Sequence, residues 1–453
     1  MSRSLAKDMT VGSPIKLVVG FAAPLLLGYL FQQLYSFVDT AIVGKVLGAE
    51  MLAAVGATGT LNFLILGLCN GMCGGFAIPI AQCFGAKDEE GLRRYMMNVI
   101  YLCAVISITV GLLTAIFCRA MLQLMATDAS IIDASVSYLA VIFAAIPVTV
   151  AYNMSAGILR ALGDSKTPVT FIAVASLVNI VLDFLFMMVF KMGVAGAAIA
   201  TVISQAVSAI GCIVVMVRRF PILHPTAEDK KLNLSMCVHL VSIGLPMGLQ
   251  YSITAIGAVI AQWSVNQISV AAVAAMTAGG KISMFFACMF DALATTMATY
   301  AGQNMGARKI RRITQGLNAA SIIGSIYCVI AYIVIRFFGP NMLSLFLDRT
   351  ADADVIVLAQ HFITTNATFY LGLLFVNIVR LSIQGMGYTQ VAMIAGVCEM
   401  FARAIVAIFF TRRIGFDAAV FANPTAWILA DLFLFPCYAI IIRRLKKQYT
   451  PRT

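Results

Sequence analysis

The chain is 453 residues long, 61% of its residues are hydrophobic and 11% are charged, and its formal net charge is +12. Soluble domains carry roughly 25% charged residues, so this composition excludes a string of soluble domains and predicts a polytopic membrane protein. Residues 1–16 are polar and no A-x-A-like cleavage site follows them, which predicts a retained first span rather than a signal peptide.

Twelve apolar segments are long enough to cross a bilayer, since a span needs about 20 apolar residues. In chain order they cover residues 17–44, 52–83, 96–118, 135–159, 169–190, 196–217, 237–264, 271–301, 316–338, 357–383, 391–411 and 425–442. The connecting loops are short, apart from RRFPILHPTAEDKKLNL (218–234) at the midpoint. Because the number of crossings is even, both termini are predicted on the same side of the membrane.

The charges of the loops predict which side that is. The side with the termini carries 22 Lys and Arg residues, the other side carries 7, and Lys281 and Arg403 fall within spans. Cytoplasmic loops are enriched in Lys and Arg, so both termini are predicted in the cytoplasm. The basic excess is mostly a signal of topology, and no nucleic-acid partner is predicted.

The two halves of the chain resemble each other. AQCFGAK (81–87) matches GQNMGAR (302–308), and LRALGDS (159–165) matches IQGMGYT (383–389) at nearly the same offset along the chain. Each copy holds six spans, so the second copy enters the membrane from the same side as the first. Such parallel repeats are related by an axis along the membrane normal.

The repeat defines the predicted fold, an all-α polytopic membrane protein with twelve transmembrane helices in two six-helix bundles related by pseudo-twofold symmetry. Its predicted parts are an N-terminal bundle (1–217), a cytoplasmic linker (218–236) and a C-terminal bundle (237–453). Two bundles that face each other across a central cavity suit rocking between inward-open and outward-open states, which favours a transporter over an enzyme or a receptor. Pro24, which matches Pro246 in the second copy, is predicted to kink the first span.

Carboxylates inside the spans indicate a functional site, since each costs at least about 2.5 kcal/mol there and usually faces the bundle interior or a water-filled cavity. Asn179 and Asp183 share one helical face, and so do Thr201 and Gln205 on the next span. Together with Asp39, their oxygen atoms can coordinate a monovalent cation or hold a proton. A satisfied network of interhelical hydrogen bonds is the alternative.

The second copy lacks this set of side chains. The positions that match Asp39, Asn179 and Asp183 are Ala261, Arg403 and Ala407. Glu399 and Arg403 are four residues apart and are predicted to pair. Two further acids, Asp291 and Asp431, have no partner that the sequence indicates.

The sequence offers little support for other chemistry. Its three histidines form no metal motif, it has no GxxxxGK[ST] loop for ATP, and its eleven cysteines include no CxxC pair. The cysteines are interpreted as small buried apolar residues, and no cofactor is predicted. GMCGG (71–75) permits close helix contact.

The motifs together resemble those of the multidrug and toxic compound extrusion (MATE) transporters over about residues 10–447. The stretches that carry the resemblance are APLLLGYLFQQLYSFVDTAIVGKVLG (23–48), GAKDEEGLRR (85–94), LRALGDSKTP (159–168), NIVLD (179–183), GVAGAAIAT (193–201) and GQNMGARKIRR (302–312). VDT (38–40) and the N-x-x-x-D spacing of 179–183 resemble the DinF-like and MepA-like bacterial branches. The NorM-like branch uses an acid in its seventh span, and residues 237–264 contain none.

The resemblance implies a monomeric multi-pass protein of the bacterial cytoplasmic membrane that exports organic cations and other amphipathic drugs in exchange for H⁺ or Na⁺. It implies a coupling site, possible for Na⁺, at Asp39, Asn179, Asp183 and Thr201, and a substrate cavity or supporting network at Gln33, Tyr35, Tyr138, Asn153 and Gln205. Pro24 would be the bending proline of the family. The bilayer and small-molecule drugs are then the partners, and the choice between H⁺ and Na⁺ stays open.

Two alternatives remain. A lipid-linked oligosaccharide flippase of the same superfamily would need cationic residues in its cavity, and the basic residues assigned to spans are only Lys281 and Arg403. A membrane-embedded enzyme would need a His-based or Ser-based catalytic set or a metal motif, and the sequence indicates neither.

Overall fold

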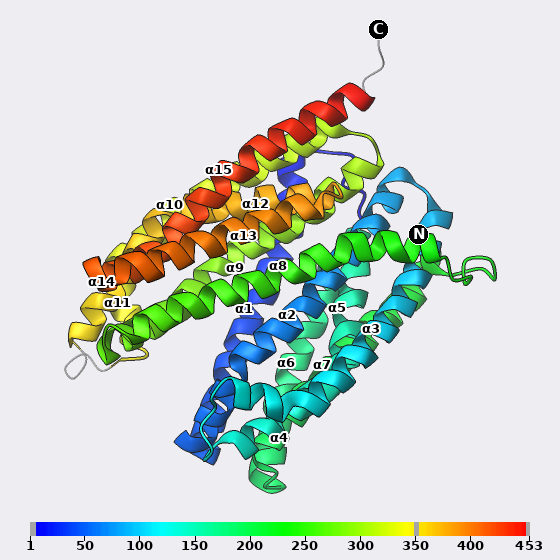
Figure 1. Cartoon of the computed structure of the whole chain (residues 1–453). Coiled ribbons are helices and arrows are strands. Elements are labelled where there is room, and N and C mark those ends of the chain that lie inside the picture. Colours follow the sequence, from blue (N-terminus) through cyan, green and yellow to red (C-terminus); the bar gives the residue numbers. More distant parts are fainter. Residues whose placement is uncertain (1–5, 348–352, 450–453) are drawn as a thin grey trace. The chain divides into compact units, whose positions relative to one another are not determined.

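The structure is a computed structural model that describes residues 6–347 and 353–449. Throughout those ranges the secondary structure is helical (Figure 1). The α-helices are α1 (Pro14–Leu47), α2 (Ala49–Ala86), α3 (Glu89–Leu124), α4 (Ile132–Ala144), α5 (Ile146–Ala161), α6 (Lys166–Phe184), α7 (Gly193–Arg219), α8 (Leu234–Asn266), α9 (Val270–Gly306), α10 (Ile310–Leu343), α11 (Ala353–Thr368), α12 (Tyr370–Gly385), α13 (Thr389–Ile405), α14 (Thr411–Ile414) and α15 (Phe416–Tyr449). Two π-helical turns, η1 (Leu185–Val189) and η3 (Val406–Phe410), and a 3-10 turn, η2 (Pro221–Leu223), complete the described secondary structure.

These helices confirm the twelve predicted spans. Ten helical segments are long and apolar enough to cross a membrane, and two bent pairs bring the number to twelve if each pair is one span. Most of the long helices extend beyond the predicted apolar segments, whereas α6 and α13 end earlier and continue as the π-helical turns η1 and η3. For example, the segment predicted at 52–83 lies inside α2.

The two bent pairs stand at matching places in the two copies. The axis turns by 47° between α4 and α5 and by 51° between α11 and α12. In the first copy Pro147 explains the turn, because its ring lacks an N–H and displaces the carbonyl of Phe143, four residues earlier. Gly111 of α3 accommodates that carbonyl, since a Cβ at Gly111 would lie 2.9 Å from the Phe143 oxygen. The second copy makes its turn at Phe369 without any proline in α11 or α12.

The chain divides into two compact units, which we describe separately. Unit 1 comprises residues 1–8 and 23–248, and unit 2 comprises residues 9–22 and 249–453. One break follows Asp8, before α1 begins, and the other two fall inside α1 and α8, close to Pro24 and Pro246. The predicted boundary lies instead in the linker, so each unit contains part of the first helix of the other copy.

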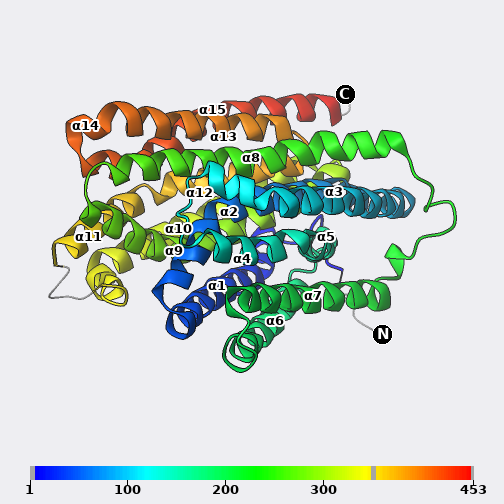
Figure 2. The ribbon, with the colours of Figure 1, turned by 60° about the horizontal axis from the view of Figure 1, so that its bottom comes forward.

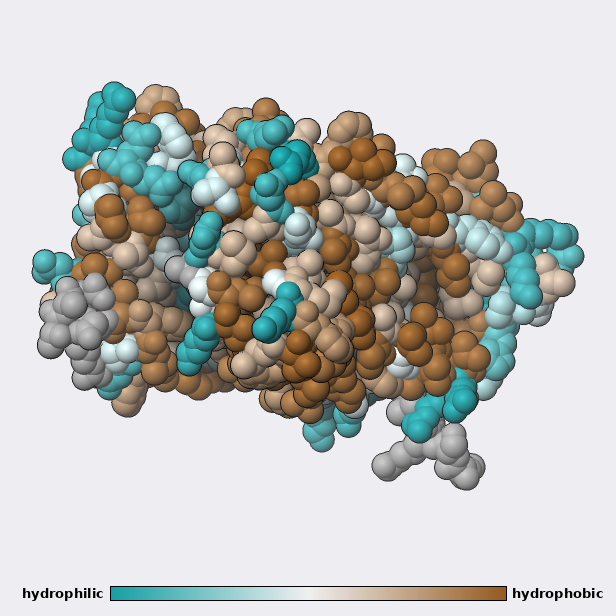
Figure 3. All heavy atoms as spheres, turned by 90° about the horizontal axis from the view of Figure 1, so that it is seen from below, coloured by the Kyte–Doolittle hydropathy of each residue, from teal (hydrophilic) through white to brown (hydrophobic). Residues whose placement is uncertain are grey.

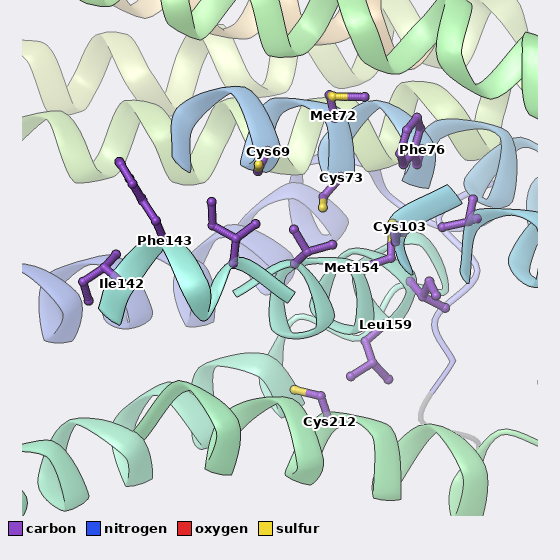
Figure 4. Close-up of a cluster of buried hydrophobic side chains, with 14 of the residues drawn as sticks. Cys69, Met72, Cys73, Phe76, Cys103, Ile142, Phe143, Met154, Leu159 and Cys212 are labelled. Atoms are coloured by element: carbon purple, nitrogen blue, oxygen red, sulfur yellow. The ribbon is translucent and has the colours of Figure 1, made fainter. Parts of the chain in front are cut away.

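Unit 1 has an extensive hydrophobic core built by α2, α3, α4, α5 and α7. Figure 4 shows its centre, where Cys73 of α2, Cys103 of α3, Phe143 of α4 and Met154 of α5 belong to one buried cluster. All eleven cysteines are free and eight of them are buried, as expected for small apolar residues.

Glycines bring α2 and the first part of α8 into close contact in unit 1. A Cβ at Gly71 would lie 2.6 Å from the carbonyl oxygen of Met247, and a Cβ at Gly75 would lie 2.6 Å from the Cα of Gly244. Small residues four apart allow helix backbones to approach in this way. The contact predicted for GMCGG (71–75) is therefore made with α8.

The linker folds against α3 in unit 1. Arg93 donates its Nε–H to Asp229 at 2.8 Å, and Asn98 Oδ1 accepts the backbone N–H of Asn233 at 2.8 Å. The backbone N–H of Thr226, followed by the Arg93 guanidinium, lowers the pKa of Asp229 to about 2. The chain is thus anchored to unit 1 immediately before α8 begins.

Unit 2 anchors the residues before α1 in a similar way. Gln303 Oε1 accepts the backbone N–H of Met9 at 2.8 Å, and Arg312 Nη2 donates to the carbonyl oxygen of Gly12 at 2.9 Å. Lys309 Nζ donates to the carbonyl oxygen of Thr10 at 3.0 Å. Within the same unit α13 and α15 lie side by side, as Figure 2 shows.

Large hydrophobic side chains are exposed along the outer faces of the helices, as expected for contact with lipid. Examples are Ile116 of α3 and Phe337 of α10, which are 70% and 73% exposed. Hydrophobic residues cover much of the face in Figure 3. The chain is therefore a multi-pass membrane protein.

Candidate functional site

Two carboxyl groups from different helices meet inside unit 1. Asp39 lies in α1, and Asp183 lies in the last turn of α6, directly before the π-helical turn η1. The two carboxyl groups lie within electrostatic range of each other, although no hydrogen bond joins them. Because two like charges in a poorly solvated interior repel one another, uptake of a proton or a small cation by the pair would relieve that repulsion.

Several polar atoms of this pair and its neighbour have no hydrogen-bond partner. They are both carboxylate oxygens of Asp183, Oδ1 of Asp39, and the oxygen and nitrogen of the Asn179 side chain, none of which bonds to a described residue. Asp183 is fully buried and Asn179 nearly so. Leaving such groups unsatisfied costs about 1–3 kcal/mol each, and more for a charged group. These oxygens suit a bound proton or a small cation.

Two tyrosines flank the acidic pair. The hydroxyl groups of Tyr35 in α1 and Tyr138 in α4 lie within electrostatic range of both Asp39 and Asp183. Neither carboxylate forms an ion pair with a basic residue in the described ranges. The nearest polar surroundings of the acids are thus neutral phenols and an amide.

A polar cavity of about 260 Å³ lies beside the pair in unit 1. Of the residues predicted from the sequence, those that line it are Tyr35, Asn153, Asn179, Thr201 and Gln205. Thr149 Oγ1 donates to Gln205 Oε1 at 2.6 Å, and Asn153 Nδ2 donates to the carbonyl oxygen of Thr149 at 2.9 Å. Thr201 Oγ1 donates back to the carbonyl oxygen of Ala197 at 3.1 Å. Its oxygen can still accept a donor or face a cation.

The structure does not place every predicted residue at this cavity. Gln33 is not among its lining residues, whereas the neighbouring Gln32 is. Tyr138 lies near the acids without lining the cavity. Besides Gln32, the polar lining residues that the sequence analysis missed are Asn70, Thr149, Tyr152, Ser176, Ser204 and Ser208. Helical spacing could have indicated the serines, because Ser176 shares a face with Asn179 and Asp183.

Pro24 lies far from the acids along α1. Roughly 22 Å of helix separate it from Asp39, at a rise of 1.5 Å per residue. The helix is continuous through the proline, from Pro14 to Leu47. The gating role of Pro24 therefore stays a prediction.

Unit 2 has a different interior, and it corrects one assignment from the sequence. Arg380, counted among the cytoplasmic charges, lies in α12 with a side chain that is 7% exposed, and it forms an ion pair with Glu399. Arg403 Nη2 also pairs with Glu399, at 3.3 Å, as predicted. Lys281 and Arg403 are therefore not the only basic residues inside spans. Without Arg380 the charge count becomes 21 against 7, which keeps the sign of the bias.

Buried amides extend the polar interior of unit 2. Arg403 Nε donates to Asn423 Oδ1 at 3.2 Å, and Gln384 Nε2 donates to Gln250 Oε1 at 2.6 Å. The charges of this interior are mostly compensated within the protein. Unit 1, by contrast, combines two carboxyl groups, orphaned oxygens and a polar cavity, and no described base forms an ion pair with either carboxylate.

The fold and the site together define a class, a membrane transporter built from two copies of a six-span repeat. The MatE family model matches residues 24–185 and 246–409. The chain belongs to the MatE family, whose members are transporters and not enzymes. The first matched range begins at Pro24 and the second at Pro246. The offset between the two ranges is nearly the same as the offset between the repeated motifs.

Relatives and solved structures agree with this membership. The "Probable multidrug resistance protein YpnP" of Bacillus subtilis is 29% identical over 81% of both chains. The "Multidrug export protein MepA" of Staphylococcus aureus strain MSSA476 is 22% identical over 85% of both chains. A solved structure described as the outward-facing conformation of a multidrug resistance MATE family transporter is 23% identical, covers 99% of both chains and has a TM-score of 0.90. The structural likeness establishes the two-lobed MATE fold.

Proposed function

We propose that the protein is a secondary active multidrug exporter that moves organic cations and amphipathic drugs out of the cell in exchange for H⁺ or Na⁺. The observation that carries the proposal is the pair Asp39 and Asp183, whose orphaned oxygens lie inside a membrane protein without an ion-paired base among the described residues. Such intramembrane acids usually mark an ion pathway. The multidrug names of the relatives in Bacillus subtilis and Staphylococcus aureus support the choice of cargo.

In the proposed cycle the acidic pair takes up one coupling ion. A proton would bridge Asp39 and Asp183, and Na⁺ would use oxygens of Asp39, Asn179, Asp183 and Thr201. Binding of either ion removes negative charge beside the cavity and so weakens its attraction for a cationic drug. Drug and ion are therefore exchanged rather than carried together.

The energy available for this exchange is sufficient. One charge that crosses 100 mV is worth about 2.3 kcal/mol, and a tenfold concentration ratio costs about 1.4 kcal/mol. For an uncharged drug, one coupled charge could thus sustain roughly a 50-fold gradient, before any gradient of the ion itself is added. One-for-one exchange of a monovalent cationic drug moves no net charge, so its export draws on the concentration gradient of the coupling ion.

The proposal includes a location and an orientation. The protein works as a monomer in the bacterial cytoplasmic membrane, with both termini and residues 218–236 in the cytoplasm. The charge bias of the loops supports this orientation. Cysteines introduced at positions 226–228 should resist a membrane-impermeant thiol reagent in intact cells, and efficient labelling there would contradict the orientation.

The alternatives receive less support. A flippase for lipid-linked oligosaccharides would need free cations for a pyrophosphate, whereas Arg380 and Arg403 both contact Glu399. A membrane-embedded enzyme has no support, because the family consists of transporters.

The test is ethidium efflux from vesicles that contain the purified protein, with the pH gradient and the Na⁺ gradient imposed separately. We expect one gradient to drive efflux and the other to have little effect. Asp39→Asn protein in the same vesicles is the control, because its amide keeps the shape of the side chain but cannot exchange a proton. Absence of efflux under either gradient, or equal efflux by the Asn variant, would contradict the proposal.

A further inference from the structure

Unit 1 carries a second and larger cavity, an apolar groove of about 570 Å³ that opens on its outer surface. It lies between α3 and α7 over a floor formed by α5. Its floor includes the buried side chains of Cys103 and Met154, whereas Ile108 and Val217 on its rims are exposed. Residues of the acidic pair and of the polar cavity do not line it.

The groove offers almost nothing to a polar ligand. The hydroxyl groups of Ser107 and Ser155 line it, but each donates to a carbonyl oxygen of its own helix, that of Ala104 and that of Tyr152. His224 of the linker stands at one end and directs its Nε2 toward the carbonyl oxygen of Val217, 2.7 Å away. The chemistry of the walls therefore favours a hydrocarbon chain.

The length of the groove matches one leaflet of the bilayer. Its lining residues on α3 extend from Met96 to Ile108, which corresponds to about 18 Å of helix. The hydrocarbon core of a bilayer is about 30 Å thick, so one leaflet measures about 15 Å. The end marked by His224 is the end at which α7 leaves for the linker.

Basic residues at that end have no acidic partner among the described residues. Arg218 and Arg219 follow Val217 directly, are exposed, and form no ion pair with any described residue. The arginines at the start of α3 differ, since Arg93 is paired with Asp229 and Arg94 with Glu90. The two arginines do not line the groove, but they follow its α7 wall directly and end that helix. An apolar groove beside such cations complements an anionic amphiphile, and a basic pocket at the membrane surface is a known form of lipid recognition.

We propose that this groove binds an anionic phospholipid, with one acyl chain between α3 and α7 and the phosphate at Arg218 and Arg219. The lipid belongs to the leaflet that the linker faces. Its binding covers apolar surface of unit 1 and adds a partner for the two arginines. The proposal stands apart from the transport cycle, because it uses none of the residues of the acidic pair or of the polar cavity.

Native mass spectrometry of the full chain in detergent tests the proposal, with phosphatidylglycerol and phosphatidylcholine as probes. Each basic residue near a membrane contributes on the order of 1 kcal/mol to binding of anionic lipid, so two arginines predict a preference for phosphatidylglycerol of roughly 30-fold. The double variant Arg218→Gln/Arg219→Gln should remove most of that preference. Arg443→Gln/Arg444→Gln, which removes an exposed arginine pair near the end of α15, is the matched control and should keep it.

A second pair of variants tests the groove itself. Ala104→Trp fills the groove from its exposed rim and should displace the lipid, whereas Val105→Trp, one position outside the lining, should not. Comparable melting temperatures of the two variants would show that both fold. Equal binding of the two lipids, the same loss in both arginine pairs, or unchanged binding by Ala104→Trp would each overturn the proposal and leave only nonspecific annular lipid.

Discussion

Unit 1 holds two carboxyl groups, Asp39 and Asp183, that form no ion pair with any described residue, whereas unit 2 holds Glu399 in contact with both Arg380 and Arg403. The two interiors descend from one repeat. Arg403 stands at the position of Asn179, four residues before the position of Asp183. Duplication has therefore preserved the fold and replaced an acidic pair by a set of ion-paired acidic and basic side chains.

The difference shows how a repeat can lose one of two equivalent sites and keep its stability. A Cβ at Gly257 would lie 3.4 Å from Arg403 Nη1, so the absence of a side chain there leaves room for the guanidinium. The matching position in unit 1, at the offset that relates Pro24 to Pro246, is Tyr35. In unit 2 the side chain of Arg403 supplies a positive charge. In unit 1 we propose that a bound H⁺ or Na⁺ supplies it instead.

The strongest expected effect is on transport and belongs to unit 1 alone. Asp39→Asn and Asp183→Asn should each abolish gradient-driven ethidium efflux, because an amide cannot exchange a proton and carries no charge for Na⁺. Asp291→Asn and Asp431→Asn should be much milder, since these acids lie outside the pair. Efflux by all four variants at matched expression is the measurement, and equal loss in all four would remove the distinction between the units.

The next effect is on stability and has opposite outcomes in the two units. Glu399→Gln removes the carboxylate that both buried guanidinium groups contact and should lower the free energy of unfolding by about 3–5 kcal/mol. Asp183→Asn removes a carboxyl group that no described base pairs with, so its melting temperature should be unchanged or higher. Thermal melting in detergent compares the two variants.

The double variant Glu399→Gln/Arg403→Met serves as the control for this comparison, because it removes one of the two uncompensated charges. It should recover part of the stability that Glu399→Gln loses. If Glu399→Gln and Asp183→Asn had the same melting temperature, the ion pairs of unit 2 would contribute nothing to the stability of the protein.

A smaller effect is expected at the two helices that the units share. Pro24 is the second residue of the part of α1 in unit 1, and Pro246 lies two residues before the end of the part of α8 in unit 1. If both prolines ease bending where a helix passes from one unit to the other, Pro24→Ala and Pro246→Ala should each slow efflux several-fold at normal expression. If only Pro24→Ala slows efflux, bending matters in α1 alone. If both variants show normal efflux, neither proline contributes to transport by easing a bend.

The smallest effect concerns the two bent helix pairs. The α11–α12 pair bends by 51° without a proline, and the α4–α5 pair bends by 47° with Pro147. Packing alone therefore suffices for the bend, so Pro147→Ala should change the free energy of unfolding by less than about 1 kcal/mol. A large loss of stability or of efflux would show that the first copy, unlike the second, depends on its proline.

The spans and the repeat could be predicted because both depend on patterns that extend over many residues. The apolar segments indicate the spans, and the motifs matched on either side of 218–234 indicate the repeat. The pairing of Asp39 with Asp183 could be anticipated, since acids in spans are rare enough to be informative. The bend at Phe369 could not, because no residue in α11 or α12 breaks a helix locally and only packing decides its place.

Other features of the interior needed the structure for physical reasons. Serines such as Ser204 bond to carbonyls of their own helix whether or not they face a cavity, so their identity does not reveal their role. Arg380 was counted among the charges of the cytoplasmic side, and its burial is explained only by its ion pair with Glu399. The division of α1 and α8 between units has no sequence signal beyond Pro24 and Pro246, which lie close to it.

The anchoring of the residues before α1 has a consequence for biosynthesis. Met9 finds its hydrogen-bond partner Gln303 294 residues later in the chain. Ribosomes add about 5–20 residues per second, so the start of the chain waits roughly 15–60 s before the helix that anchors it has been made. During that interval the first part of α1 must reside in the membrane without its final neighbours, and the newly made first half of the chain is exposed to chaperones and proteases in an incomplete form.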